Sequence, residues 1–182
     1  IAGVAGWYIW QEKLKEIAYW GKPIFVEDFE DDSWKEDWIE YKGKWKREDG
    51  RILTNKGTDF YFFYRKKLHG SIAIEFEGEM LSGSAPGDLS IIYSSDIKWN
   101  KNKTKILSLK NRYFFQASAY YNTFAMIQKP PQRLDYKLLK LEPSRVYNIR
   151  AELDKTELRL FINNRLICQS SLMFPVDSCY VG

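Results

Sequence analysis

The chain has 182 residues, a length that suits either one folded domain with a substantial core or one domain plus an appendage. Its net charge is +4, but the basic residues are scattered among 24 acidic ones, so the sequence lacks the basic stripe typical of nucleic-acid binding, and we expect no nucleic-acid partner. One histidine, His69, and two cysteines exclude a His/Cys zinc site of ordinary spacing and leave little material for a catalytic triad.

Residues 1–22 predict a short helix that is the end of a membrane anchor. Ten apolar, small or aromatic residues come first, and Trp7, Tyr8 and Trp10 lie where this run meets the polar "QEKLKE". Aromatic residues gather at such membrane interfaces, whereas a spanning helix needs about 20 apolar residues, so we expect the helix to continue upstream. The alternatives are an amphipathic helix packed on its own domain and the remains of a signal peptide.

From residue 23 onward the pattern changes to short strands. "PIFVEDF" predicts a strand at residues 23–29, and "DDSWKEDWIEY" predicts a helical turn near Trp34. "GKWKREDGRIL" predicts two strands joined by a turn at Asp49 and Gly50. The segment "TDFYFFYRK" is aromatic on both faces, which is typical of a strand buried on both sides.

The segment "SIAIEFEGEM" alternates between apolar and acidic residues. Alternate residues of a strand point the same way, so Glu75, Glu77 and Glu79 should line one face. Two hypotheses account for them. They are either the solvated side of an antiparallel sheet or the carboxylates of a retaining glycosidase, which lie about 5–5.5 Å apart.

The second half of the chain predicts further antiparallel pairs. "DLSIIYSS" predicts a strand, and "DIKWNKNKTK" a loop in which Trp99 stands among lysines. Trp99 can stack on a sugar or help to bind an anionic partner; the alternative is a solvated loop with one aromatic ring packed under it. "NRYFFQASAYY" and "TFAMIQ" predict a strand pair, and "KPPQRLDYKLLKL" a loop and an extended segment. "SRVYNIRAEL", "ELRLFI" and "RLICQSSL" predict a meander, with a type I′ turn at Asn163 and Asn164. Many short strands with regular turns indicate an antiparallel sandwich or barrel.

The order of these segments resembles the concanavalin A-like lectin/glucanase superfamily over residues 24–182. Trp38, Gly43–Trp45 and Asp49–Leu53 resemble its opening strands, and "IAIEFEGEM…GDLSIIY" its paired central strands. "YNIRAELDKTELRLFINNRLI" resembles its late hairpin, with Asn164 in place of the usual Gly. The resemblance implies an all-β jelly-roll sandwich whose last strand continues beyond the sequence. The subgroup is left open between sugar-hydrolase-like domains of bacterial envelope proteins and laminin-G-like domains.

The same resemblance implies roles for the acidic residues. Laminarinase-type members carry E-x-D-x-E as nucleophile, helper acid and general acid/base, which would map to Glu75, Glu77 and Glu79. This sequence departs from that pattern because Glu replaces the middle Asp and Gly78 replaces an apolar residue. Asp88 resembles an acidic calcium-binding loop of laminin-G-like domains, but Ca²⁺ takes 6–8 oxygens and one Asp is not a site. We therefore expect no cofactor, with calcium as the alternative.

The function expected from these patterns is that of a non-catalytic binding module for carbohydrate or protein, with Trp99, Glu75 and Glu77 as candidate ligand-binding residues. We expect membrane anchoring through the N-terminus, a location in a bacterial cell envelope outside the cytoplasm, and a role as an accessory subunit of a membrane complex. The alternative is a glycoside hydrolase that uses the glutamate strand. Because an envelope location permits disulfides, Cys168 and Cys179 are either bridged or two buried thiols.

Overall fold

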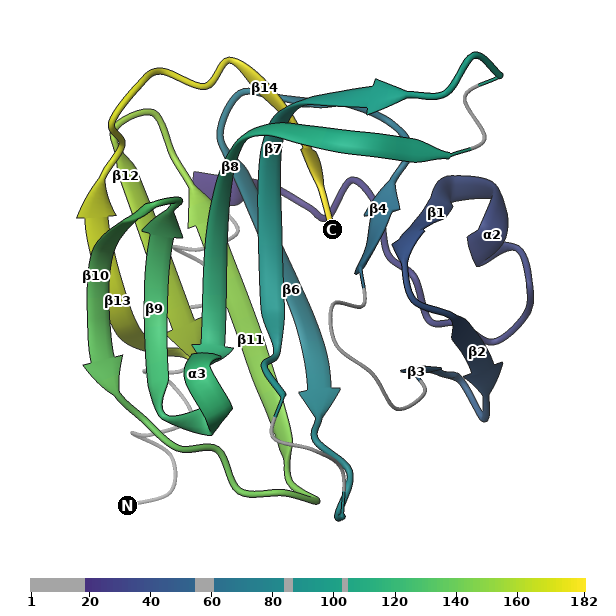
Figure 1. Cartoon of the computed structure of the whole chain (residues 1–182), viewed down its shortest axis with the longest axis horizontal. Coiled ribbons are helices and arrows are strands. Elements are labelled where there is room, and N and C mark those ends of the chain that lie inside the picture. Colours follow the sequence, from purple (N-terminus) through teal and green to yellow (C-terminus); the bar gives the residue numbers. More distant parts are fainter. Residues whose placement is uncertain (1–18, 55–60, 84–86, 103–104) are drawn as a thin grey trace.

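The computed structural model describes residues 19–54, 61–83, 87–102 and 105–182, and it consists mainly of antiparallel strands (Figure 1). The helical turns are α2 (Trp34–Asp37) and α3 (Ala119–Asn122). The strands are β1 (Trp38–Lys42), β2 (Trp45–Glu48), β3 (Arg51–Thr54), β4 (Tyr61–Tyr64), β5 (Leu68–His69), β6 (Ile72–Glu79), β7 (Ser90–Trp99), β8 (Ile106–Ser118), β9 (Phe124–Lys129), β10 (Gln132–Leu138), β11 (Val146–Leu153), β12 (Glu157–Ile162), β13 (Arg165–Ser171) and β14 (Ser178–Val181).

Two sheets form the predicted sandwich. A six-stranded sheet has the order β10-β9-β8-β7-β14-β5, and a four-stranded sheet has the order β13-β12-β11-β6. In Figure 1 the six-stranded sheet lies in front of the four-stranded one. Two small sheets, β1-β4 and β2-β3, lie beside them. The all-β class and the antiparallel sandwich are confirmed.

The main core fills the space between the two sheets. In β11 and β12, the first two strands of the predicted meander, alternate residues are buried, as period-2 alternation requires when one sheet face is covered; these residues are Tyr147, Ile149, Ala151, Leu153, Leu158, Leu160 and Ile162. They meet Tyr93 and Phe115 of the six-stranded sheet. The Tyr93 hydroxyl donates a hydrogen bond to the Ala151 carbonyl at 2.8 Å, which joins the two sheets inside the core.

A second core covers part of the outer face of the six-stranded sheet. Ile39 of β1 and Phe63 of β4 pack with Ile92 and Ile97 of β7. Gly182 lies against Phe63, where an added Cβ would approach a ring carbon to 2.8 Å. Because this second core covers β7 and the first half of β8, the outward side of the end of β8, of β9 and of β10 is the part left open.

Two local predictions were wrong. Residues 23–29 form no strand, because Phe25 packs against Trp38 and Tyr64 while its neighbours find no strand to pair with. Trp99 ends β7 and does not lie in a loop. The loop and extended segment predicted for "KPPQRLDYKLLKL" are present: residues 132–138 form the regular strand β10, since Pro130 and Pro131 occupy the turn and leave the following N–H groups free to pair with β9.

The predicted N-terminal helix, with Trp7, Tyr8 and Trp10, lies outside the described residues apart from its end at Tyr19 and Trp20. Within the part of the chain that the structure describes, no helix is long and apolar enough to cross a membrane.

The two cysteines are buried free thiols on opposite sheets. Cys168 belongs to β13 and Cys179 to β14, and the Cys168 thiol donates to the Ala125 carbonyl at 3.5 Å. A bulge where β12 pairs with β13 turns Leu166 outward, away from the face that buries Cys168. Leu166 therefore does not share the inward face of Cys168, where the alternation of a regular strand would place it.

We expect thiol labelling of the denatured, unreduced protein to find two free thiols. Detection of no free thiol would instead show that Cys168 and Cys179 form a disulfide. The native protein should react slowly, because burial raises the pKa of both Cys168 and Cys179 to about 12 and the thiolate is the reactive form.

The buried thiols should also make stability depend on pH. In the unfolded chain a thiol ionises near pH 8.5. The difference between the folded and unfolded pKa values makes the buried neutral thiols contribute to stability, and this contribution is complete below about pH 8.5 and is lost as pH rises toward 12. Thermal unfolding from pH 7 to 10, with Cys168→Ala/Cys179→Ala as the flatter control, measures it.

Candidate functional site

The three glutamates of β6 share the outer face of the four-stranded sheet, as predicted. Glu75 accepts a hydrogen bond from the Asn148 side chain at 2.6 Å and pairs with Arg150 at 3.2 Å. Glu79 pairs with Arg51 at 3.4 Å, and Glu77 is exposed between them. Two of the three carboxylates are therefore held by cations. The glycosidase hypothesis stays a prediction that an activity assay must test.

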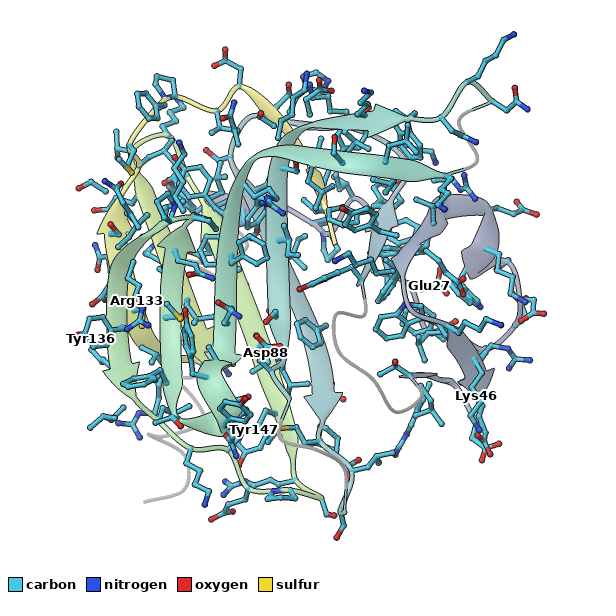
Figure 2. All side chains as sticks on the ribbon, in the orientation of Figure 1. Glu27, Lys46, Asp88, Arg133, Tyr136 and Tyr147 are labelled. Carbon is cyan, nitrogen blue, oxygen red and sulfur yellow. The ribbon has the colours of Figure 1, made fainter. Side chains whose placement is uncertain are left out.

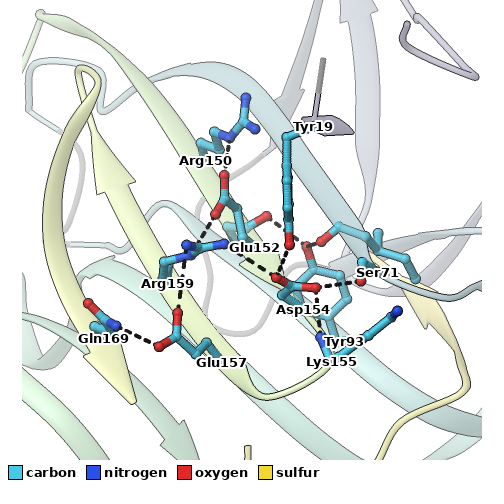
Figure 3. Close-up of polar contacts among 12 residues, drawn as sticks. Tyr19, Ser71, Tyr93, Arg150, Glu152, Asp154, Lys155, Glu157, Arg159 and Gln169 are labelled. Atoms are coloured by element: carbon cyan, nitrogen blue, oxygen red, sulfur yellow. Dashed lines mark hydrogen bonds and ion pairs between the residues drawn. The ribbon is translucent and has the colours of Figure 1, made fainter. Parts of the chain in front are cut away.

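Arg150 joins Glu75 to a charge network that crosses this sheet. Figure 3 shows the network from Arg150 onward. Glu152 binds Arg150 at 2.9 Å through one oxygen and Arg159 at 2.8 Å through the other. Arg159 also lies 3.6 Å from Glu157 and 3.7 Å from Asp154. Glu152 is 4% exposed, so its charge depends on the two guanidinium groups for compensation.

Asp154 ends this network beside Tyr19 (Figure 3). It accepts hydrogen bonds from the Ser71 hydroxyl at 2.5 Å and from the Tyr19 hydroxyl, and these donors, Ser71 first, lower the pKa of Asp154. Tyr19 and Trp20 form one wall of an open hollow of about 480 Å³ over the network. The charges on this face satisfy one another, which is the arrangement expected of a structural surface.

A different set of groups lies on the outward side of β8–β10. We call this surface, with the adjoining ends of β7 and α3, the front face (Figure 2). A polar row crosses it. The Gln128 side chain donates to Gln116 Oε1 at 2.8 Å, and Gln116 donates to the Asp88 carboxylate. Arg133 stands opposite Gln128 in the β9–β10 pairing, so the row continues to the sheet edge. Among the described residues the buried Ser90 hydroxyl has no hydrogen-bond partner.

Aromatic rings border one end of the polar row. The Arg133 guanidinium lies 4.7 Å from the ring centre of Tyr120 and 6.0 Å from that of Tyr136. Phe124 makes edge contacts with both tyrosines, at 6.5 and 5.8 Å between ring centres. Tyr120 and Tyr121 are 50% and 85% exposed, so their rings are available to a ligand.

The turn that carries these tyrosines has an unfavourable backbone. Tyr120, Tyr121 and Asn122 have φ values of 52°, 59° and 59°, a left-handed conformation that costs about 1–2 kcal/mol for each residue other than glycine. Asn122 holds the turn, because its side chain donates to the Leu141 carbonyl at 2.7 Å and accepts from the Leu141 amide at 2.8 Å. Strain of this kind is common at functional sites, which makes the turn a candidate site element.

The sequence identified one residue of the front face, and for a different reason. Asp88 was a calcium candidate, but in the structure it accepts from Gln116, and no group of three or more His, Cys, Asp or Glu suited to a metal occurs among the described residues. Trp99, predicted to be an exposed ligand-binding residue, is half-buried and packs edge-on against Tyr180 at 6.2 Å. The sequence analysis missed the front-face residues Gln116, Gln128, Arg133, Tyr120, Tyr121 and Tyr136. The sequence analysis included Ala119–Tyr121 in the strand "NRYFFQASAYY", which was wrong, because β8 ends at Ser118 and α3 follows. The run "AYYN" was the available signal for this site.

No protein-family model matches the chain, and neither does any curated protein. Among solved structures, a Bacillus subtilis protein with a galectin-like fold is 12% identical over 87% of each chain, with a TM-score of 0.66. The Emp46p carbohydrate recognition domain is 16% identical, with 86% of this chain and 84% of that one covered and a TM-score of 0.61. The carbohydrate-binding module CBM66 of Bacillus subtilis is 8% identical, with 80% and 87% covered and a TM-score of 0.57. These likenesses show that the fold is a lectin-like β-sandwich.

Proposed function

We propose that this protein is a carbohydrate-binding module and that the front face holds the sugar. The observation that carries the proposal is the polar row from Asp88 to Arg133 ending at exposed tyrosines on a strained turn. Carboxylate, amide and guanidinium groups match the donors and acceptors of sugar hydroxyls, and flat rings match the apolar face of a sugar. Two neighbours in fold are described as a carbohydrate-binding module and a carbohydrate recognition domain, which supports the same ligand class.

The wider setting is also proposed. Trp7, Tyr8 and Trp10 would lie at a membrane interface, with the sandwich in the cell envelope as an accessory subunit of a membrane complex. Fractionation of cells that carry the full-length protein tests this. Recovery in the membrane fraction is expected, and recovery in the soluble fraction would contradict the anchor.

Glycan-array and affinity-electrophoresis measurements test the sugar site. Arg133→Met removes the charged donors and should weaken binding about 10- to 100-fold, since a hydrogen bond to a charged group contributes about 1.5–3 kcal/mol. Lys137→Met, an exposed lysine on the same strand, is the matched control and should bind like the wild type. Equal binding by both variants would refute the front-face assignment. If the wild type releases reducing ends from a glycan and the Glu75→Gln variant does not, the glycoside hydrolase alternative is established instead.

A further inference from the structure

A second hollow lies at one end of the sandwich, where residues 172–177 cross from β13 to β14. Its volume is about 290 Å³, near the lower limit for ligand pockets. The residues that line it include Ser95, Asn111, Tyr113, Lys129 and Phe174. None of these residues belongs to the front face, so an inference here goes beyond the proposed sugar site.

Lys129 gives the hollow a positive charge. Its ammonium lies 4.6 Å from the ring centre of Phe174 and 5.9 Å from that of Tyr113. No carboxylate in the described part of the chain forms an ion pair with Lys129. The cation is therefore held by ring faces and keeps its ability to bind an anion.

Tyr113 supplies an unused donor in the same place. The residue is 2% exposed, and its hydroxyl has no hydrogen-bond partner within the described residues. Burial raises the pKa of the Tyr113 phenol, and the neighbouring backbone of Phe174 and Met173 partly offsets that rise. Buried polar groups of folded proteins normally find a partner, and a ligand oxygen would be one.

We infer that this hollow binds the carboxylate of a small acid, between the Lys129 ammonium and the Tyr113 hydroxyl. One cation matches one negative charge, and the Tyr113 hydroxyl can donate a hydrogen bond to a carboxylate oxygen. Asn111 and Ser95 offer polar contacts for hydroxyl groups, while Phe174 offers an apolar surface. This chemistry fits an acidic monosaccharide better than a simple carboxylate, and a comparison of the two is part of the test.

The experiment uses the full chain with glucuronate, acetate and glucose at constant ionic strength. Calorimetry and ligand-observed NMR should show saturable binding of glucuronate, weaker binding of acetate, and no binding of glucose at this hollow. Lys129→Met and Tyr113→Phe should each weaken glucuronate binding about tenfold or more. Lys137→Met is the control for loss of positive charge and should leave the affinity unchanged.

Circular dichroism and the thermal midpoint verify the folding of each variant. Tyr113→Phe should melt at or above the wild-type temperature, since it removes a buried unpaired hydroxyl; if it does not fold, Lys129→Met decides alone. Arg133→Met separates the two sites, because it should lose neutral sugar and keep glucuronate. The inference is overturned if glucuronate does not bind, or if Lys129→Met binds it as the wild type does. Acetate binding equal to that of glucuronate would overturn the acidic-sugar preference.

Discussion

Replacing Glu152 by alanine should lower the free energy of unfolding by about 3 kcal/mol, at the low end of the cost of breaking a buried ion pair. The carboxylate lies between Arg150 and Arg159, whose side chains are 12% and 24% exposed. Its removal leaves two partly buried guanidinium groups without their shared partner. The partial exposure of Arg159 admits some water, which is why the expected loss is not larger.

Glu77→Ala is the matched control for that variant. Glu77 lies on the outer face of the same sheet but is exposed, so its loss should change stability by less than about 0.5 kcal/mol. Urea unfolding followed by tryptophan fluorescence measures both variants. A loss for Glu152→Ala as small as that for Glu77→Ala would show that the network of Figure 3 contributes little to stability.

The double variant Tyr120→Gly/Tyr121→Gly should raise stability by about 1 kcal/mol and remove most sugar binding. Glycine adopts positive φ without the steric cost that the two tyrosines bear. Part of this stabilisation is offset because glycine loses more conformational entropy on folding than tyrosine does. The same change removes the exposed rings that border the polar row. Opposite effects on stability and affinity are expected when strain serves a binding site.

Thr123→Gly provides the contrast, because Thr123 has a φ of −116° and bears no such strain. We expect this variant to lose stability by about 0.5–1 kcal/mol or more. Thermal unfolding and affinity electrophoresis on the same samples give both quantities. If the double glycine variant is less stable than the wild type, the turn is not strained as described; if it binds sugar normally, the tyrosines are not part of the site.

The sequence predicted the features that depend on neighbouring residues alone, such as hairpin turns and the alternation of buried and exposed residues along a strand. Asn163 and Asn164 form the expected hairpin turn with φ values of 49° and 62°, and β6 buries its apolar face as its alternation requires. The front face was not predictable in this way. Its polar row needs the pairing of β8, β9 and β10, and pairing between strands is set by the whole fold. The left-handed Tyr120 and Tyr121 carry no local signal, because tertiary bonds from Asn122 hold them against their preference.

The position of β14 has a consequence for how the protein is made. In the six-stranded sheet β14 lies between β7 and β5, and its Ser178 pairs with His69. Roughly a hundred residues of chain separate these partners, and such long-range pairing is typical of slow folding, in milliseconds to seconds. A ribosome adding about 5–20 residues per second needs several seconds to supply that length. During synthesis the edge of β7 that receives β14 is therefore open to other strands, and chaperones would have their greatest effect in this interval.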